Sequence, residues 1–262
     1  RDRYANNADE QYTYIDAAKN KGYNVLLMDG QLDVPMINML EQKLEKSRFT
    51  RVDSDIIDRL IVKEDAHGEE LAEDKRQTLS TLFSGQLPKV QKVEFHVETR
   101  AMGETSAPIV ITQAEYMRRM KDMASIQPGM SFYGEMPDMY SLVLNSDHKL
   151  VKQVLEDAES ACAEQLVPVE SEIAMLTLRQ KELQKAHEGK KDEEIPVAEK
   201  DELKDVEKKL DDQKQQKNNV LNTYAAGNKV VHQLIDLALL QNNMLKGEAL
   251  TNFVKRSIDL IG

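Results

Sequence analysis

Residues 160–223 carry the pattern that most restricts what this chain can fold into. Apolar or neutral residues recur at alternating spacings of four and three, in two runs: Val169, Ile173, Leu176, Gln180 and Leu183, then Leu203, Val206, Leu210, Gln213, Val220 and Tyr224. Gly189 and Pro196 lie between the runs and are expected to break helical structure. The spacing predicts an antiparallel helical hairpin with a narrow apolar seam.

Charge surrounds that seam. Residues 181–214 hold nine Lys and twelve Asp or Glu, which is typical of solvated outer helix faces. Two roles are compatible with such a hairpin. It is either a spacer or insertion without chemistry of its own, or a coiled coil that binds a partner protein.

The C-terminal segment predicts two further helices. The first is apolar on nearly every face, so it must be buried, and the second has one apolar stripe. Burial against a second copy as a four-helix bundle would satisfy both helices, and packing on the chain's own sheet is the alternative. The residues expected at a dimer interface are Val231, Leu234, Leu237, Leu240, Leu250, Val254, Ile258 and Ile261.

The remaining chain predicts an α+β protein with two parts. Residues 1–70 are expected to form a small α/β unit, with helices at 7–20 and 33–45, a buried parallel strand at 23–28 and a second strand at 48–53. Residues 71–262 form the second domain, in which 160–223 is the insertion. Its expected strands (89–100, 107–112, 139–145) and helices (113–125, 147–158) suggest a small antiparallel sheet covered by helices.

Bulk properties exclude several classes of protein. The net charge of −11 argues against nucleic acid as a partner. No apolar run is long enough to cross a membrane, and the single cysteine, Cys162, fits a reducing cytoplasm. The chain begins at Arg1 without an initiator methionine, so we expect a fragment of a longer protein.

Catalytic and metal sites are not indicated. The five histidines, His67, His96, His148, His187 and His232, show no i, i+4 pair, and Cys162 has no second cysteine, so no zinc site is expected. His148 begins a helix and is interpreted as a structural hydrogen-bonding residue. The sequence also lacks a glycine-rich phosphate loop, and Ser106 and Ser131 lack the context of a nucleophile.

Methionine is concentrated in residues 116–140, which contain six of the twelve: Met117, Met120, Met123, Met130, Met136 and Met139. Methionine side chains are flexible and suit surfaces that accommodate varied partners. On a helix, Tyr116, Met117, Met120 and Met123 share one face, and the opposite face is charged: Arg118, Arg119, Lys121 and Asp122. The stretch is therefore either a binding surface or core packed on strands 90–97 and 107–112.

Three segments resemble the ninety-kilodalton heat-shock chaperones, most closely the bacterial type. They are "KGYNVLLMDGQLDVPMINMLE", "LNSDHKLVKQVLED" and "LIDLALLQNNMLKGEALTNFVKRSIDLI". The resemblance implies that residues 1–70 are the end of a middle domain and residues 71–262 a C-terminal dimerisation domain. It also implies that the ATP and magnesium site lies upstream of residue 1, so that this fragment has no cofactor and is not an enzyme. The charged hairpin departs from the short connection typical of the family.

The resemblance further implies which residues touch non-native client proteins. The position of residues 113–134 matches the family's client-contacting helix and loop, and the candidate residues are Tyr116, Met117, Met120, Met123, Ile126, Met130 and Phe132. We therefore expect a homodimeric, cytoplasmic chaperone of the stress response that acts in protein folding. The alternative function is a coiled-coil scaffold acting through residues 160–223. An enzyme is the weakest reading because no catalytic constellation occurs.

Overall fold

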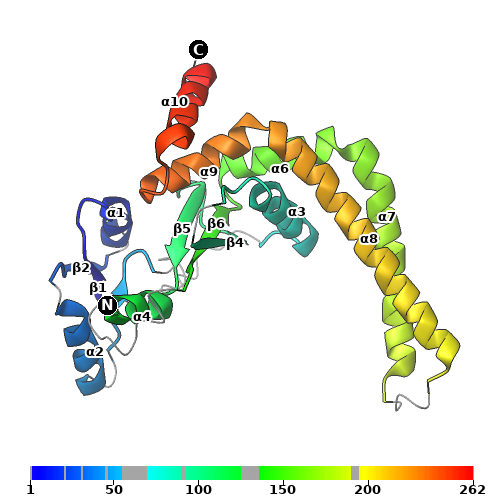
Figure 1. Ribbon diagram of the computed structural model, residues 1–262, viewed down its shortest axis with the longest axis horizontal. Helices are drawn as coiled ribbons and strands as arrows, with labels where there is room; N and C mark the ends of the chain where they lie inside the picture. Colours follow the sequence, from blue (N-terminus) through cyan, green and yellow to red (C-terminus); the bar gives the residue numbers. More distant parts are fainter. Residues whose placement is uncertain are drawn as a thin grey trace.

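The N-terminal part of the chain is a small parallel α/β unit (Figure 1). A computed structural model describes residues 2–20, 22–30, 32–44, 47–54, 70–89, 92–124, 136–189 and 195–261. The first sheet contains, in spatial order, β2 (Asn24–Leu27), β1 (Asp2–Ala5) and β3 (Thr50–Arg51), all parallel. Helices α1 (Tyr12–Asn20) and α2 (Asp33–Lys43) connect them.

This unit contains a strand that the sequence analysis did not predict, β1, which lies between β2 and β3. It also corrects one expectation. Strand β2 is not buried: Leu26 and Leu27 are 41% and 57% exposed, since β2 is an edge strand of this sheet. The core of the unit is small and is formed by Ala5, Ile15, Ala18, Tyr23 and Val52.

The second sheet is mixed rather than antiparallel, so that prediction was wrong. Its spatial order is β4 (Val93–Arg100), β6 (Asp138–Asn145) and β5 (Ile109–Gln113). Strand β6 pairs in parallel with β4 and antiparallel with β5. The chain between β4 and β6 includes β5 and α4 (Glu115–Ala124), which is long enough for the crossover that a parallel pair needs. Helices α3 (Glu73–Ser84), α6 (Lys149–Ala161) and α9 (Lys229–Gln241) contribute the main core with this sheet.

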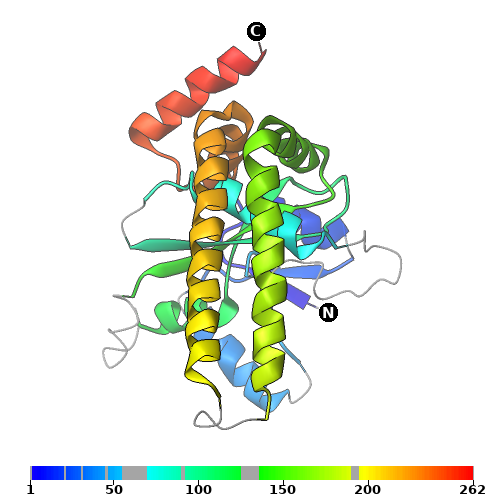
Figure 2. The ribbon, with the colours of Figure 1, turned by 90° about the vertical axis from the view of Figure 1, so that its right-hand side faces the viewer.

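The predicted hairpin is confirmed. Helices α7 (Ala163–His187) and α8 (Val197–Gly227) run side by side (Figure 2) and project from the domain (Figure 1). Gly189 follows α7 with a φ of +77°, and Pro196 precedes α8. The root of the hairpin is not a separate insertion, because Leu166, Leu221 and Ala225 belong to the main core. Further out, Leu183, Val206 and Leu210 are buried only in the seam between the two helices.

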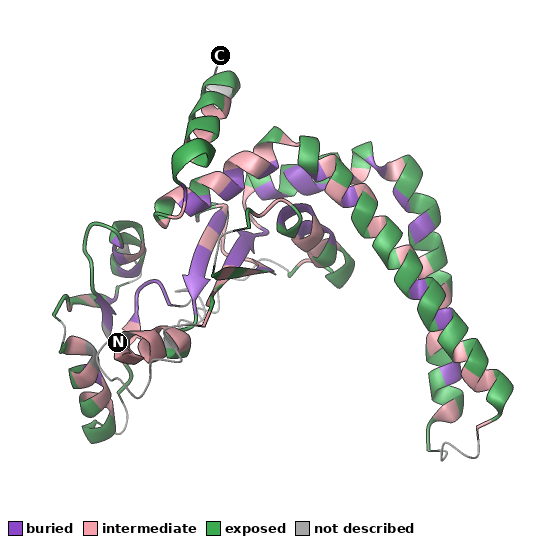
Figure 3. Ribbon diagram, viewed as in Figure 1, coloured by how far each residue is buried: buried purple, intermediate pink, exposed green. Residues whose placement is uncertain are grey.

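The two C-terminal helices differ in burial. Helix α9 begins at a cap in which the Asn228 side-chain oxygen accepts hydrogen bonds from the amides of Val230 and Val231. Its buried residues join the main core, so α9 packs on its own domain, as the alternative reading proposed. Helix α10 (Gly247–Ile261) projects from α9, and much of its surface is exposed (Figure 3).

Candidate functional site

Helix α4 carries Tyr116, Met117, Met120 and Met123, which we call the methionine strip. The helix is anchored through its basic face. Arg118 pairs with Asp53 at 2.7 Å, and Lys121 with Asp138 at 2.6 Å. Arg119 pairs with Glu41 at 2.8 Å and also donates to the carbonyl of Phe49. The basic residues predicted to lie opposite the methionines therefore share a face, but that face does not point into water. Arg118 and Arg119 attach α4 to the N-terminal unit, and Lys121 attaches it to β6.

Asp53 is the centre of this anchor. Its carboxylate is almost buried and accepts hydrogen bonds from Gln11 at 2.6 Å, from Arg51 at 3.2 Å and from Arg118. Charge-assisted hydrogen bonds of this kind are stronger than neutral ones. One carboxylate thus holds two arginines from different elements and joins β3 to α4.

Two titratable groups reinforce the same junction. The buried Tyr14 hydroxyl lies 2.8 Å from the carbonyl oxygen of Ile111 and 3.1 Å from the side-chain oxygen of Asn242, and burial raises its pKa to about 12. Burial also acts to raise the pKa of Glu41. Hydrogen bonds from Arg119 and the Phe49 amide, with the charges of Arg119 and Arg48, outweigh it and lower the pKa overall.

The opposite face of α4 is partly open. Tyr116 is 62% exposed, and Met117, Met120 and Met123 are half-buried. Among the described residues, these three methionines are not members of the core over the second sheet. The other predicted client-contact residues, Ile126, Met130 and Phe132, lie outside the described residues. The prediction that this strip binds clients stays a prediction.

Helix α10 presents a second open apolar face. Val254 and Ile258 are 48% and 65% exposed, and Leu250 on the same face is half-buried. Other residues of the helix contact α9: Arg256 pairs with Asp236, and Gln233 donates to the Ser257 hydroxyl at 2.6 Å.

The predicted dimer residues divide by burial. Val231 and Leu234 are buried in the chain's own core and have little surface left for a partner. Leu237 on α9 is 39% exposed, and Leu240 is half-buried. The side chain of Ile261, at the end of α10, lies outside the described set. The open part of the predicted interface is therefore mainly on α10.

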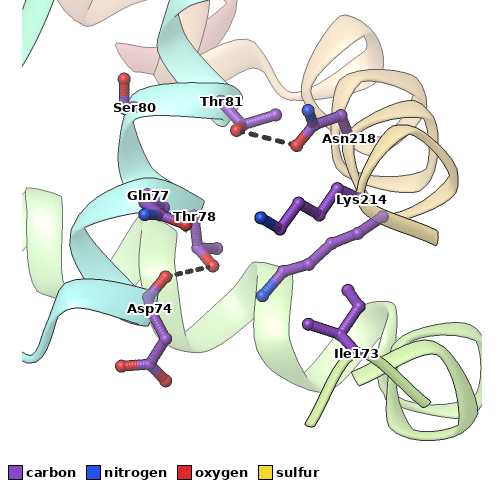
Figure 4. Close-up of a pocket in the computed structure, with 9 residues that line it drawn as sticks. Asp74, Gln77, Thr78, Ser80, Thr81, Ile173, Lys214 and Asn218 are labelled. Atoms are coloured by element: carbon purple, nitrogen blue, oxygen red, sulfur yellow. Dashed lines mark hydrogen bonds between the residues drawn. The ribbon is translucent and has the colours of Figure 1, made fainter. Parts of the chain in front are cut away.

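The sequence did not predict a cavity of about 350 Å³ that lies where α3 meets the hairpin (Figure 4). Lys214 of α8 reaches toward Gln77 and Thr78 of α3 across it, and Lys217 also lines the cavity. Most of its polar groups are occupied: Thr78 donates to the Asp74 carbonyl at 2.9 Å, and Lys217 pairs with Glu170 at 2.7 Å. No catalytic constellation is assembled by these lining groups.

Two of the residues considered for chemistry, His148 and Cys162, have structural roles. The predicted role of His148 is confirmed, because its Nδ1 accepts a hydrogen bond from the Leu150 amide at 3.2 Å and caps α6. Cys162 is buried where α6 meets α7, and burial raises the pKa of its thiol. Within the described residues, no group of three His, Cys, Asp or Glu could hold a metal ion.

None of the helices in the described part of the chain combines the length and the apolar character needed to span a bilayer.

Comparisons with known proteins give a consistent result. The chain is 67% identical over 258 residues to a protein from Bacteroides fragilis named "Chaperone protein HtpG". It is 64% identical to a protein of the same name from Bacteroides thetaiotaomicron and 45% identical to one from Porphyromonas gingivalis. Each match covers 98% of this chain and 38% of the relative, so the chain spans well under half the length of the curated proteins it matches. No protein-family model matches the chain.

Proposed function

Because the chain belongs to the HtpG family of chaperones, we propose that it supplies homodimerisation and part of the client-binding surface of an ATP-dependent chaperone. The chain matches only 38% of its relatives, and we assign ATP and magnesium binding to the part of the protein outside it. This chain alone is then not an ATPase and needs no cofactor. Its partners are a second copy and non-native proteins in the cytoplasm.

The observation that carries the proposal is the open apolar face of α10. Val254 and Ile258 lie four residues apart on one face, and both are exposed while Arg256 and Ser257 hold the helix to α9. Exposed large apolar side chains in a row favour association with another surface. A second copy that brings its own α9 and α10 against this face would complete a four-helix bundle.

The test is the solution mass of the chain and of a variant with Val254→Glu and Ile258→Glu. We expect the wild type to hold near twice 29.8 kDa by light scattering across a dilution series. The two glutamates should raise the dimer dissociation constant by about a hundredfold or more, because their carboxylates would have to lose their hydration to enter an apolar interface. Both side chains are exposed in one chain, so helicity by circular dichroism should not change.

Val197→Glu is the matched control, because Val197 on α8 is 72% exposed and lies far along the chain from α10. It should leave the mass unchanged. A wild type that is monomeric at every concentration would rule out α10 as a dimer surface.

Client contact is assigned to the open face of α4. Tyr116 and the neighbouring methionines form an adaptable apolar strip on a helix whose other face is fixed by three ion pairs. A fixed helix with a soft apolar face suits transient contact with unfolded chains. Dimerisation would place two such strips in one particle and raise the effective concentration of the second.

A double variant, Tyr116→Ser with Met120→Ser, tests the client surface. We expect it to suppress the aggregation of a heat-unfolded reporter enzyme several-fold less well than the wild type, because the apolar contact area is lost. Tyr12→Ser is the control, since Tyr12 is 67% exposed but lies on α1. If Tyr12→Ser suppressed aggregation as poorly as the double variant, the methionine strip would not be the client surface.

A further inference from the structure

Helix α7 has apolar residues on two opposite sides. One side forms the seam with α8 through residues such as Val169 and Leu183. On the other, Val167, Met175 and Leu178 are 60%, 68% and 62% exposed. At about 100° per residue, residues 167, 171, 174, 175 and 178 fall in one sector of roughly 100°, opposite Val169. We call these five residues the outer face of α7.

The side chains at the centre of the outer face are small, and they include no unsatisfied polar group. Ala174 and Ser171 lie between Val167 and Leu178, and the Ser171 hydroxyl donates to the Val167 carbonyl at 2.8 Å. Small side chains between larger ones allow another helix to approach closely. The face runs for about three helical turns, or roughly 16 Å, which is a length that a short helix can cover. Figure 3 shows that much of the surface of α7 is exposed.

The charges beside the outer face are acidic as far as Leu178; Arg179 and Lys181 follow, and Arg179 pairs with Glu182 and Glu202. From Gln153 to Leu178 the chain contains no Lys or Arg and six carboxylates: Glu156, Asp157, Glu159, Glu164, Glu170 and Glu172. Glu170 is paired with Lys217 and Glu159 with Lys75. Neither Glu164 nor Glu172, which flank the outer face, has a cationic partner among the described residues. An apolar strip with an acidic border is complementary to a basic amphipathic helix.

We propose that the outer face of α7 docks a basic amphipathic helix of a partner protein. The apolar residues of the partner helix cover Val167, Ala174 and Leu178, and the lysines or arginines of the partner helix face Glu164 and Glu172. A second copy of this chain is a poor occupant in a symmetric contact, because it would bring the same acidic segment against itself. The hairpin then adds an interaction surface that is separate from α4 and α10.

A designed peptide can test this surface on the full chain. The probe is a fluorescein-labelled helix of about 16 residues, with leucines at i, i+4, i+7 and i+11 and lysines elsewhere. We expect saturable binding by fluorescence anisotropy that weakens with added salt. Val167→Ser with Leu178→Ser keeps every charge and should weaken binding by about tenfold or more. Glu164→Gln with Glu172→Gln should weaken it by a few-fold and reduce the salt dependence.

Two controls make the test decisive. Val197→Ser alters an equally exposed valine outside the outer face and should leave peptide affinity unchanged. A peptide with glutamates in place of its lysines should not bind. The proposal is overturned if the wild type does not bind the basic peptide, or if Val167→Ser with Leu178→Ser binds it as tightly as the wild type. It is also overturned if that variant instead abolishes a self-association seen in the wild type, because a second copy would then occupy the face.

Discussion

Tyr14 is a single residue that joins three distant parts of the chain. From α1, its hydroxyl reaches the carbonyl of Ile111 on β5 and the side chain of Asn242 just beyond α9. Burial is the main reason that its pKa rises from 10.0 to about 12. The folded state therefore favours the neutral phenol more strongly than the unfolded state does.

This shift predicts a loss of stability at high pH. The unfolded chain releases the Tyr14 proton near pH 10 and the folded chain near pH 12, so the contribution is complete below pH 10 and disappears between the two. The shift corresponds to about 2–3 kcal/mol. Urea denaturation from pH 9 upward should show a smaller decline for Tyr14→Phe than for the wild type, because phenylalanine cannot ionise. Tyr12→Phe, at an exposed position, should follow the wild type. Identical profiles for Tyr14→Phe and the wild type would contradict this role.

At the same scale, the sequence predicts local roles better than distant ones. The cap formed by His148 could be predicted because its partner, Leu150, is two residues away. The anchoring role of Arg118 and Arg119 could not, because their partners Asp53 and Glu41 are 65 and 78 residues distant. A charged helix face has the same sequence pattern whether it meets water or carboxylates.

At the scale of elements, the long helices could be predicted from the sequence, whereas the sheets could be predicted only in part. The hairpin was predictable because its apolar period is repeated over several turns, and α9 because it is apolar on nearly every face. Strand β1 was missed because "DRYA" is four residues long and shows no clear alternation. The order β4-β6-β5 depends on pairings between residues far apart in the sequence. Local periodicity does not predict such pairings.

The anchor of α4 gives a prediction at this scale. Asp53→Asn removes the charge that holds Arg51 and Arg118, leaving two nearly buried guanidinium groups without their carboxylate. We expect the free energy of unfolding to fall by about 2–4 kcal/mol. Amide hydrogen exchange at pH 7 should accelerate in α4 and β3 more than in α8, because the loss is local to the junction.

Asp9→Asn is the control for this measurement, because Asp9 is exposed in the same unit and makes no ion pair among the described residues. Uniform acceleration across all helices in Asp53→Asn would show that the carboxylate supports the whole fold instead of anchoring α4.

Acid should weaken the neighbouring contact for a related reason. The pKa of Glu41 is lowered overall in the fold, so its contribution is present above the ordinary value of 4.5 and is lost as the pH falls through the lowered pKa. The contact between α2 and α4 therefore depends on an ionised Glu41. Acid should weaken the attachment of α4, the helix that carries the half-buried methionines.

For the whole molecule, the hairpin has two parts that are packed differently. Its root belongs to the main core through Leu166, Leu221 and Ala225, whereas its outer part is held only by its own seam. Cross-helix contacts fix the register, since Glu170 pairs with Lys217 and Gln180 donates to Glu207 at 3.3 Å. The boundary between structural root and projecting arm therefore lies inside the segment that the sequence marked as one insertion.

Two deletions should consequently behave differently. Replacing residues 176–211 by a short Gly–Ser linker joins positions that face each other and keeps the root, so we expect the main core and the dimer to persist. Deleting residues 165–220 removes Leu166 from the core and should lower the free energy of unfolding by about 3–5 kcal/mol or prevent folding. Thermal denaturation and light scattering compare the two. If the shorter deletion also loses suppression of client aggregation while its dimer stays intact, the arm carries the function assigned to α4, as the scaffold alternative requires.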